Sequence, residues 1–395
     1  MTLLRQLFFE HVGQTSDNPI GVEVSRAEGI YLYSPEGKRY VDLISGVSVS
    51  NVGHGNSAVV DAVCEQVKDY MHLMVYGEYV QTPQVKYAQK ITSLLPEGLD
   101  SVYFVSTGSE AIEGAMKLAK RFTARTEMIS FKNAYHGSTH GALSLMGGED
   151  FRYAFRPLLP DVKQLSYGEF SDIEAITERT ACVVVEPIQG EGGIIIPPKG
   201  YLQALRERCS EVGALLIFDE IQVGFFRTGA PFRFMQEGVV PDILCTAKAF
   251  GGGMPLAAFI SSDEIMSTLK NNPVLGHITT FGGHPVCCAA GMAALDYILD
   301  NELTAQVEAK GAIFEDALKV LPVVKEVRRA GLIMAIDLGD AALAEKVVWA
   351  LVEAGYITEW FLFYDKAFRI APPLTISEDE CREVVFDIVS VLSNL

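Results

Sequence analysis

The chain has 395 residues, of which 49% are hydrophobic and 21% are charged, a balance typical of a folded protein rather than a disordered one. Its 50 acidic and 32 basic side chains give a net charge of −18, which argues against nucleic acid or an anionic membrane surface as a partner. Because this length exceeds what one hydrophobic core usually organises, we expect a large domain and a smaller one.

Neither export nor membrane insertion is predicted. The N-terminal apolar run ends at Glu10, too early for a secretory signal, and no stretch of about 18 apolar residues occurs. The seven cysteines are scattered without a CxxC pair, which indicates reduced, mostly buried thiols and no metal site. We therefore expect a cytoplasmic protein.

The N-terminal part contains a predicted β-hairpin at residues 30–44, with its turn at Pro35-Glu36-Gly37. From about residue 100 to residue 290, short apolar runs alternate with helical stretches. Strands are predicted at residues 102–105, 128–131, 182–185, 214–218, 243–245 and 257–260. Such continuously apolar strands are typical of a mostly parallel sheet covered by helices on both faces, which predicts an α/β large domain.

A polar turn follows the first of these strands. Thr107-Gly108-Ser109-Glu110 places a hydroxyl three residues before a glutamate, the pattern of a capping box at the start of a helix. Free N–H groups and the helix dipole also make such a start suitable for a phosphate. Taken alone, the motif is more simply explained as an ordinary helix cap.

Two charged residues stand out in apolar surroundings. Asp219 ends a strongly apolar strand, at the edge where α/β sheets bind ligands, although an isolated aspartate there is more often structural. Lys248 is the one charge in TAKAFGGGMP, where burial lowers the pKa of an amine and leaves it nucleophilic. A lone buried lysine more often extends its amine to solvent, but three glycines after it indicate close backbone packing. A lysine, a carboxylate and a phosphate-binding helix start are together what pyridoxal phosphate (PLP) requires.

The C-terminal part has a different pattern. It predicts helices at residues 286–299 and 303–321, short strands near 331–338 and 368–370, and a last helix from Ser377. We predict that residues 1–47 and 286–395 form a discontinuous small α+β domain, and that residues 48–285 form the large one.

Five segments together resemble the class III aminotransferases. They are residues 182–192 (CVVVEPIQGEG), 219–229 (DEIQVGFFRTG), 246–255 (TAKAFGGGMP), 279–285 (TTFGGHP) and 368–374 (FRIAPPL). The resemblance extends from Tyr31 to Leu374. The family includes the ornithine, acetylornithine and 4-aminobutyrate aminotransferases and has the fold-type-I PLP architecture. The resemblance therefore implies a PLP-dependent aminotransferase that works by a ping-pong mechanism.

The resemblance also implies roles around the cofactor. Lys248 would form the internal aldimine and relay the proton, while Asp219 would pair with the pyridinium nitrogen. Thr280 would reach the phosphate of the neighbouring subunit's cofactor, which implies a homodimer with shared active sites. The remaining cofactor-binding residues would be Thr107, Gly108 and Ser109 at the phosphate, Ile221 and Tyr135 on the two ring faces, Gln222 near the ring's 3-oxygen, and His136 and Glu186 beside them.

Three positions bear on the substrates. Arg369 matches the arginine that binds a substrate carboxylate, and Glu191 matches the residue that pairs with this arginine in the ornithine and 4-aminobutyrate enzymes. Both favour an ω-amino donor with 2-oxoglutarate as the acceptor. Val47 stands where the ornithine enzymes tend to have a tyrosine, which weakens the case for ornithine itself. Gly53-His54-Gly55-Asn56 and His284-Pro285 also depart from the family's pattern.

Two other functions stay open. A PLP-dependent aminomutase or racemase on the same fold would share Lys248 and Asp219 but would not need the Glu191 and Arg369 pair. A PLP-binding protein without activity would require damage to this set of residues, and the sequence shows none.

Overall fold

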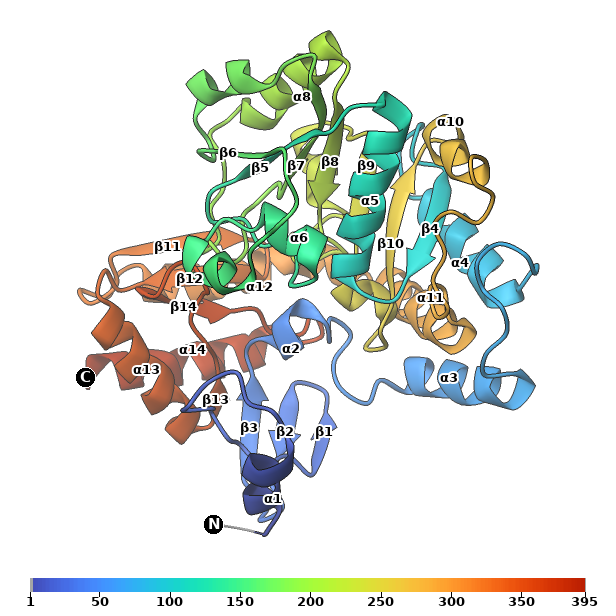
Figure 1. Ribbon diagram of the computed structural model, residues 1–395. Coiled ribbons are helices and arrows are strands. Elements are labelled where there is room, and N and C mark those ends of the chain that lie inside the picture. The colour runs from blue at the N-terminus through green and yellow to red at the C-terminus, as the bar shows by residue number, and fades with distance from the viewer. Residues whose placement is uncertain (1–2, 395) are drawn as a thin grey trace.

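The computed structural model describes residues 3–394, and these contain a seven-stranded sheet in the upper half of the molecule as seen in Figure 1. The strand order is β4-β10-β9-β8-β7-β5-β6, and β10 runs antiparallel to both of its neighbours while the strands from β9 to β6 pair in parallel. The strands are β4 (Ser101–Val105), β5 (Glu127–Phe131), β6 (Val162–Leu165), β7 (Thr180–Val185), β8 (Leu215–Asp219), β9 (Ile243–Thr246) and β10 (Ala257–Ser261).

Helices cover both faces of this sheet. Cys182 and Val184 pack in one core cluster with α5 (Gly108–Thr123), whereas Val183 and Val185 pack in another with α8 (Tyr201–Val212). Because successive side chains of a strand point to opposite faces, the two clusters lie on opposite sides of the sheet. The predicted mostly parallel sheet with two covered faces is therefore confirmed.

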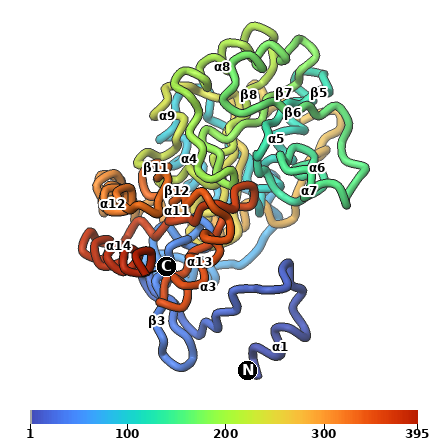
Figure 2. Tube along the Cα trace, turned by 90° about the vertical axis from the view of Figure 1, so that its left-hand side faces the viewer, coloured from blue at the N-terminus to red at the C-terminus, as the bar shows by residue number. Residues whose placement is uncertain are grey.

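The two ends of the chain meet in one sheet. Strand β3 (Arg39–Asp42) pairs in parallel with β13 (Tyr356–Ile357). Figure 2 shows both termini in the lower half of the molecule, below the seven-stranded sheet. The other strands there are β1 (Arg26–Glu28) and β2 (Tyr31–Tyr33) beside β3, and a separate antiparallel sheet of β11 (Glu326–Ala330), β12 (Ile333–Asp337) and β14 (Ala367–Ile370).

Helices α12 (Leu303–Leu318), α13 (Ala341–Ala354) and α14 (Glu378–Ser393) pack against one another and against these strands. No helix of the described part is long and apolar enough to cross a membrane. The remaining helices are α1 (Leu3–His11), α2 (Ser45–Ser48), α3 (Ser57–Asp69), α4 (Thr82–Thr92), α6 (His140–Leu145), α7 (Glu149–Arg152), α9 (Arg233–Glu237), α10 (Asp263–Met266) and α11 (Pro285–Asp300).

Most predicted elements are confirmed within a few residues. The hairpin turn closes with the amide of Gly37 donating to the carbonyl of Ser34, and Ser377 caps α14. The cysteines are free thiols, and all except Cys64 are buried. Strands β1, β6 and β11 were not predicted, because their side chains are largely half-exposed and polar. The domain boundaries at residues 47 and 286 stay a prediction.

A buried arginine joins the two parts of the molecule. The guanidinium of Arg227, which is completely buried, donates hydrogen bonds to the carbonyls of Leu332 and Pro372 and to the side chain of Asn51. The amide of Leu332 donates back to the carbonyl of Arg227 at 3.1 Å. Burial lowers the pKa of Arg227 to about 9. The loop that follows β8 is thereby fixed to Asn51 and to two segments of the C-terminal part.

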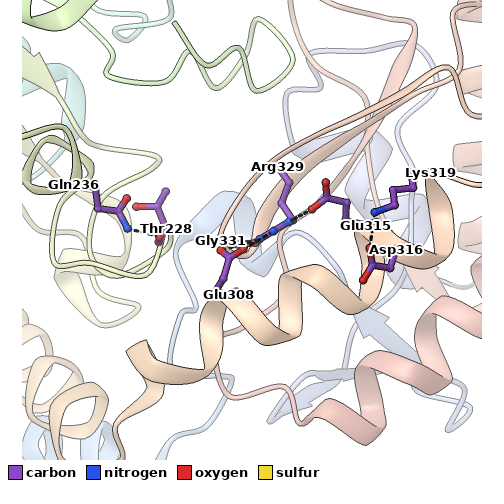
Figure 3. A network of polar contacts seen from close by, with 8 residues as sticks. All are labelled: Thr228, Gln236, Glu308, Glu315, Asp316, Lys319, Arg329 and Gly331. Atoms are coloured by element: carbon purple, nitrogen blue, oxygen red, sulfur yellow. Dashed lines mark hydrogen bonds and ion pairs between the residues drawn. The ribbon is translucent and has the colours of Figure 1, made fainter. Parts of the chain in front are cut away.

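A second arginine fixes α12 to β11 (Figure 3). Arg329 Nε donates to Glu315 at 2.6 Å and Nη1 donates to Glu308 at 3.0 Å, so that one guanidinium binds two carboxylates that lie about two turns apart on the helix. The ion pair of Lys319 and Asp316 lies further along the same helix, and both of its side chains are exposed. Bidentate, partly buried pairs stabilise a fold more than exposed single contacts do.

We expect Arg329→Met to lower the free energy of unfolding by about 1–2 kcal/mol, because two carboxylates lose a bidentate partner. Lys319→Met is the matched control, since it removes an equal charge from an exposed pair, and it should leave the unfolding midpoint in urea unchanged. Equal shifts of the two midpoints would contradict this account.

Candidate active site

A cavity of about 390 Å³ opens at the carboxyl edge of the seven-stranded sheet. Residues that follow β4, β7, β8 and β9 meet there, as expected where parallel strands end together. Most of the predicted site residues lie in its wall: Thr107, Gly108, Ser109, Tyr135, His136, Glu186, Glu191, Asp219, Ile221, Gln222 and Lys248. Sequence reasoning did not identify the other wall residues: Val49, Ser106, Gly137, Ala247, Gly253, Met254, Pro255 and Leu256.

One end of this cavity is the start of α5. Thr107 caps the helix by accepting a hydrogen bond from the amide of Glu110 at 3.2 Å, and the Glu110 carboxylate accepts from the amides of Ser106 and Thr107. The predicted capping box is thus confirmed. A Cβ atom at Gly108 would lie 3.0 Å from Ile221, so a larger residue there would require that side chain to shift. This end offers hydroxyls and helix N–H groups to an anion.

A buried carboxylate and imidazole lie deeper in the cavity. Asp219, the last residue of β8, is 4% exposed, and its Oδ2 is 2.7 Å from Nδ1 of His136. Its Oδ1 accepts a hydrogen bond from the amide of Ile221 at 3.0 Å. Burial disfavours protonation of His136, but the hydrogen bond and charge of Asp219 outweigh burial and raise the pKa of the imidazole. These two contacts fix the orientation of the Asp219 carboxylate.

Glu186 supports the same region from the end of β7. Its carboxylate accepts hydrogen bonds from the amides of Tyr135 at 3.0 Å and Gly190 at 2.9 Å. Burial raises the pKa of Glu186 to about 7, and the nearby Asp219 adds to the shift while His136 opposes it. Glu186 therefore positions the segments that carry Tyr135 and Glu191.

Lys248 follows β9 and begins a short 3₁₀ helix, Lys248–Gly251. Its φ of 54° lies in the left-handed region, which non-glycine residues seldom adopt and which is common at functional sites. Gly252 has a φ of 62°, and a Cβ atom there would collide with the carbonyl of Ala290 in α11. The glycine therefore packs this turn against a helix and fixes the backbone around Lys248.

Burial lowers the pKa of the Lys248 amine, although the carboxylate of Glu191 opposes the shift. A larger fraction of the amine is therefore neutral at a given pH than for an ordinary surface lysine. The neutral form is the nucleophile.

Glu191 and Arg369 form a buried ion pair. Oε1 of Glu191 accepts from Nη2 of Arg369 at 2.8 Å and from Nε2 of Gln222 at 2.9 Å, and Oε2 accepts from the amide of Leu362 at 3.2 Å. Burial would raise the pKa of Glu191, but the charges of Arg369 and Lys248 and these hydrogen bonds lower it. Arg369, in β14, is 1% exposed and stacks over the ring of Phe361.

A second cavity of about 630 Å³ shares Tyr135, Glu191 and Lys248 with the first. Val47 lies in its wall, within the turn α2, where Val47 has a φ of 65°. The carboxylate of Asp42 holds this turn by accepting from the amides of Ile44 and Ser45. The cavity is completed by residues that sequence reasoning did not identify: Phe8, Gly13, Gln14, Thr15, Ser16, Asn18, Pro19, Ile20, Glu359, Trp360 and Leu362.

Glu359 could have been noticed from the sequence, because it is the one charged residue in the apolar stretch from Tyr356 to Tyr364. The wall formed by residues 8–20 has no comparable signal. Thr280 lies apart from both cavities, in an exposed loop. The structure therefore brings together every predicted site residue except Thr280.

Comparisons with known proteins agree with this arrangement. Residues 12–392 match the family described as class III aminotransferases. The acetylornithine aminotransferase of Methanopyrus kandleri is 40% identical over 370 residues, which cover 92% of each chain.

Solved structures are similar over nearly the whole chain. The ornithine aminotransferase of Toxoplasma gondii has a TM-score of 0.92 at 29% identity, covering 99% of this chain and 93% of that one. The acetylornithine aminotransferase of Elizabethkingia anophelis has a TM-score of 0.87 at 31% identity, covering 99% and 98%.

The lowered pKa of Lys248 predicts how the cofactor-free protein will be modified. An amine-directed reagent should label Lys248 with a pH midpoint below that of Lys319, whose pKa is raised by its hydrogen bond to Asp316. Peptide mass spectrometry measures both midpoints in one sample, and the difference should vanish after denaturation. Equal midpoints for Lys248 and Lys319 in the folded protein would contradict a lowered pKa for the Lys248 amine.

Proposed function

We propose that this chain, which belongs to the class III aminotransferases, transfers an amino group from an ω-amino donor to 2-oxoglutarate by a ping-pong mechanism. The enzymes of this family depend on pyridoxal phosphate. Relatives that act on acetylornithine and ornithine make donors of this chemistry the first to test. The observation that carries the proposal is the buried pair of Glu191 and Arg369 beside Lys248.

The polar groups that line the first cavity fit the cofactor. The start of α5 suits a phosphate, the carboxyl group of Asp219 suits a protonated ring nitrogen, and the amine of Lys248 suits an aldehyde. Ile221 and Tyr135 supply an apolar and an aromatic surface for the two faces of a ring, and Gln222 lies beside Glu191 in the same wall. When bound, the cofactor holds the amino group between the two half-reactions and withdraws electrons from the reacting carbon.

The chain's own residues position the substrates and move the proton. Hydrogen bonds with His136 and with the amide of Ile221 hold the carboxylate of Asp219 in place. Nζ of Lys248, with its lowered pKa, can take a proton from the substrate carbon and return it. Glu191 neutralises Arg369 while an amine without a nearby carboxylate is bound. Moving Glu191 away frees the guanidinium to bind a carboxylate of 2-oxoglutarate in bidentate fashion.

We further propose a homodimer in the cytoplasm, with Thr280 reaching the partner's cofactor phosphate. Apolar side chains around Thr280 are exposed, including Val274 at 69% and Phe281 at 56%. The ring of His72 lies beside that of Phe281, with the two centroids 5.0 Å apart, so the segment that carries His72 borders the same surface. Contiguous apolar surface of this kind supports a protein interface.

We expect Phe281→Glu to shift the protein toward a monomer in sedimentation equilibrium and to weaken cofactor retention, because a charge would be buried at the interface. Phe386→Glu is the matched control, since Phe386 is 73% exposed on α14, outside this surface. If the Phe281→Glu protein keeps the mass and the cofactor of the wild type, the proposed interface is wrong.

The central test is Glu191→Ala in single-turnover measurements of each half-reaction. The glutamate half-reaction should become as fast or faster, because Arg369 no longer has to break an ion pair. The half-reaction with ω-amines should slow by roughly tenfold or more, because these donors now meet an uncompensated cation.

The control is Glu353→Ala, which removes a charge from the exposed end of α13. It should change neither half-reaction. Equal slowing of both half-reactions in Glu191→Ala would mean that Glu191 has only a structural role. The proposed preference for an ω-amino donor would then have no support.

A further inference from the structure

The second cavity contains more negative than positive charge. The charged residues in its wall are Glu191, Lys248 and Glu359. Arg369 is 1% exposed and lies behind the two glutamates, so its guanidinium is not part of the wall. A donor that enters this cavity therefore meets carboxylates rather than the arginine.

Glu359 lies beside Arg369, but the two side chains do not form a hydrogen bond. The amide of Arg369 donates to the carbonyl of Glu359 at 2.8 Å, which places the two residues on adjacent, paired segments. The side-chain atoms, Oε1 of Glu359 and Nη1 of Arg369, are 3.7 Å apart, which is too far for a hydrogen bond. Nη1 is buried and has no acceptor among residues 3–394. The Glu359 side chain is 30% exposed, and its carboxylate oxygens remain available to a ligand.

Two carboxylates, Glu191 and Glu359, share the guanidinium of Arg369, and Lys248 is the other cation of this group. Glu191 is paired with Arg369 at 2.8 Å and also accepts from Gln222, so its charge is already compensated. Whenever the Lys248 amine is neutral, Glu359 is the surplus carboxylate. Burial and the neighbouring negative charge of Glu191 raise the pKa of Glu359, although Arg369 opposes this shift, as expected for a carboxylate with an incomplete counter-ion.

We propose that Glu359 binds a second ammonium group of the amino donor, so that the donor class is a diamine. The reacting amine would lie at Lys248 and the distal ammonium at Glu359. Val47, Trp360 and Leu362 supply the apolar wall for the methylene chain between them. This inference rests on the proposed function, because it specifies the ω-amino donor of the same site.

The test compares straight-chain diamines of three to six carbons with monoamines in which a methyl group replaces one ammonium. With 2-oxoglutarate as acceptor, the wild type should have a kcat/KM at least about tenfold higher for the best diamine than for its monoamine. Glu359→Gln should reduce this ratio to near one. Glu359→Asp should retain most of it, because the carboxylate remains.

A binding measurement provides a second readout. Diamines with both nitrogens dimethylated stay cationic but cannot react, so calorimetric titration of the holoenzyme measures their affinity alone. Glu359→Gln should raise their Kd by about tenfold. Glu353→Gln, which removes an equal charge six residues earlier, should leave the Kd as in the wild type.

The outcomes separate this inference from the proposed function. A wild type that converts monoamines and diamines equally well would overturn the role of Glu359 and leave the aminotransferase activity toward ω-amines in place. A wild type that transfers no amino group from any amine to 2-oxoglutarate would overturn both. A diamine preference that Glu359→Gln leaves intact would assign the ammonium site to another residue.

Discussion

The carboxyl ends of the parallel strands bring residues that are distant in sequence to one edge of the sheet. Asp219 ends β8, Lys248 follows β9, and the start of α5 follows β4. Strands β8 and β9 are buried along their whole length, so their ends are fixed by packing and not by the polar residues themselves. The apolar sheet therefore positions charged groups that would be too costly to bury one by one.

The charged groups of the site compensate one another in two separate sets. Asp219, His136 and Glu186 form one set around the first cavity, and Glu191, Arg369 and Glu359 form the other around the second. Lys248 lies between the sets and lines both cavities. The charges of both sets act on the pKa of the Lys248 amine, those of Glu191 and Arg369 more strongly than that of Asp219.

The sequence predicts the large sheet and the first cavity well, because both depend on local patterns. Continuous apolar runs such as residues 182–185 define the buried strands, and the capping box at Thr107 defines the start of α5. The second cavity is less predictable. Glu359 and residues 8–20 reach it only through tertiary packing, and the left-handed turn at Val47 is imposed by Asp42 and not by the preference of a β-branched residue.

The buried guanidinium of Arg227 limits how the molecule can move. It joins Asn51, Leu332 and Pro372, and a rigid-body separation of the segments that it joins would leave it without acceptors in the interior, at a cost of about 3–5 kcal/mol. Arg227 therefore keeps these segments together as one unit. Any change in the width of the second cavity would have to come from the parts of its wall outside this unit, such as residues 13–20 and the segment of Trp360.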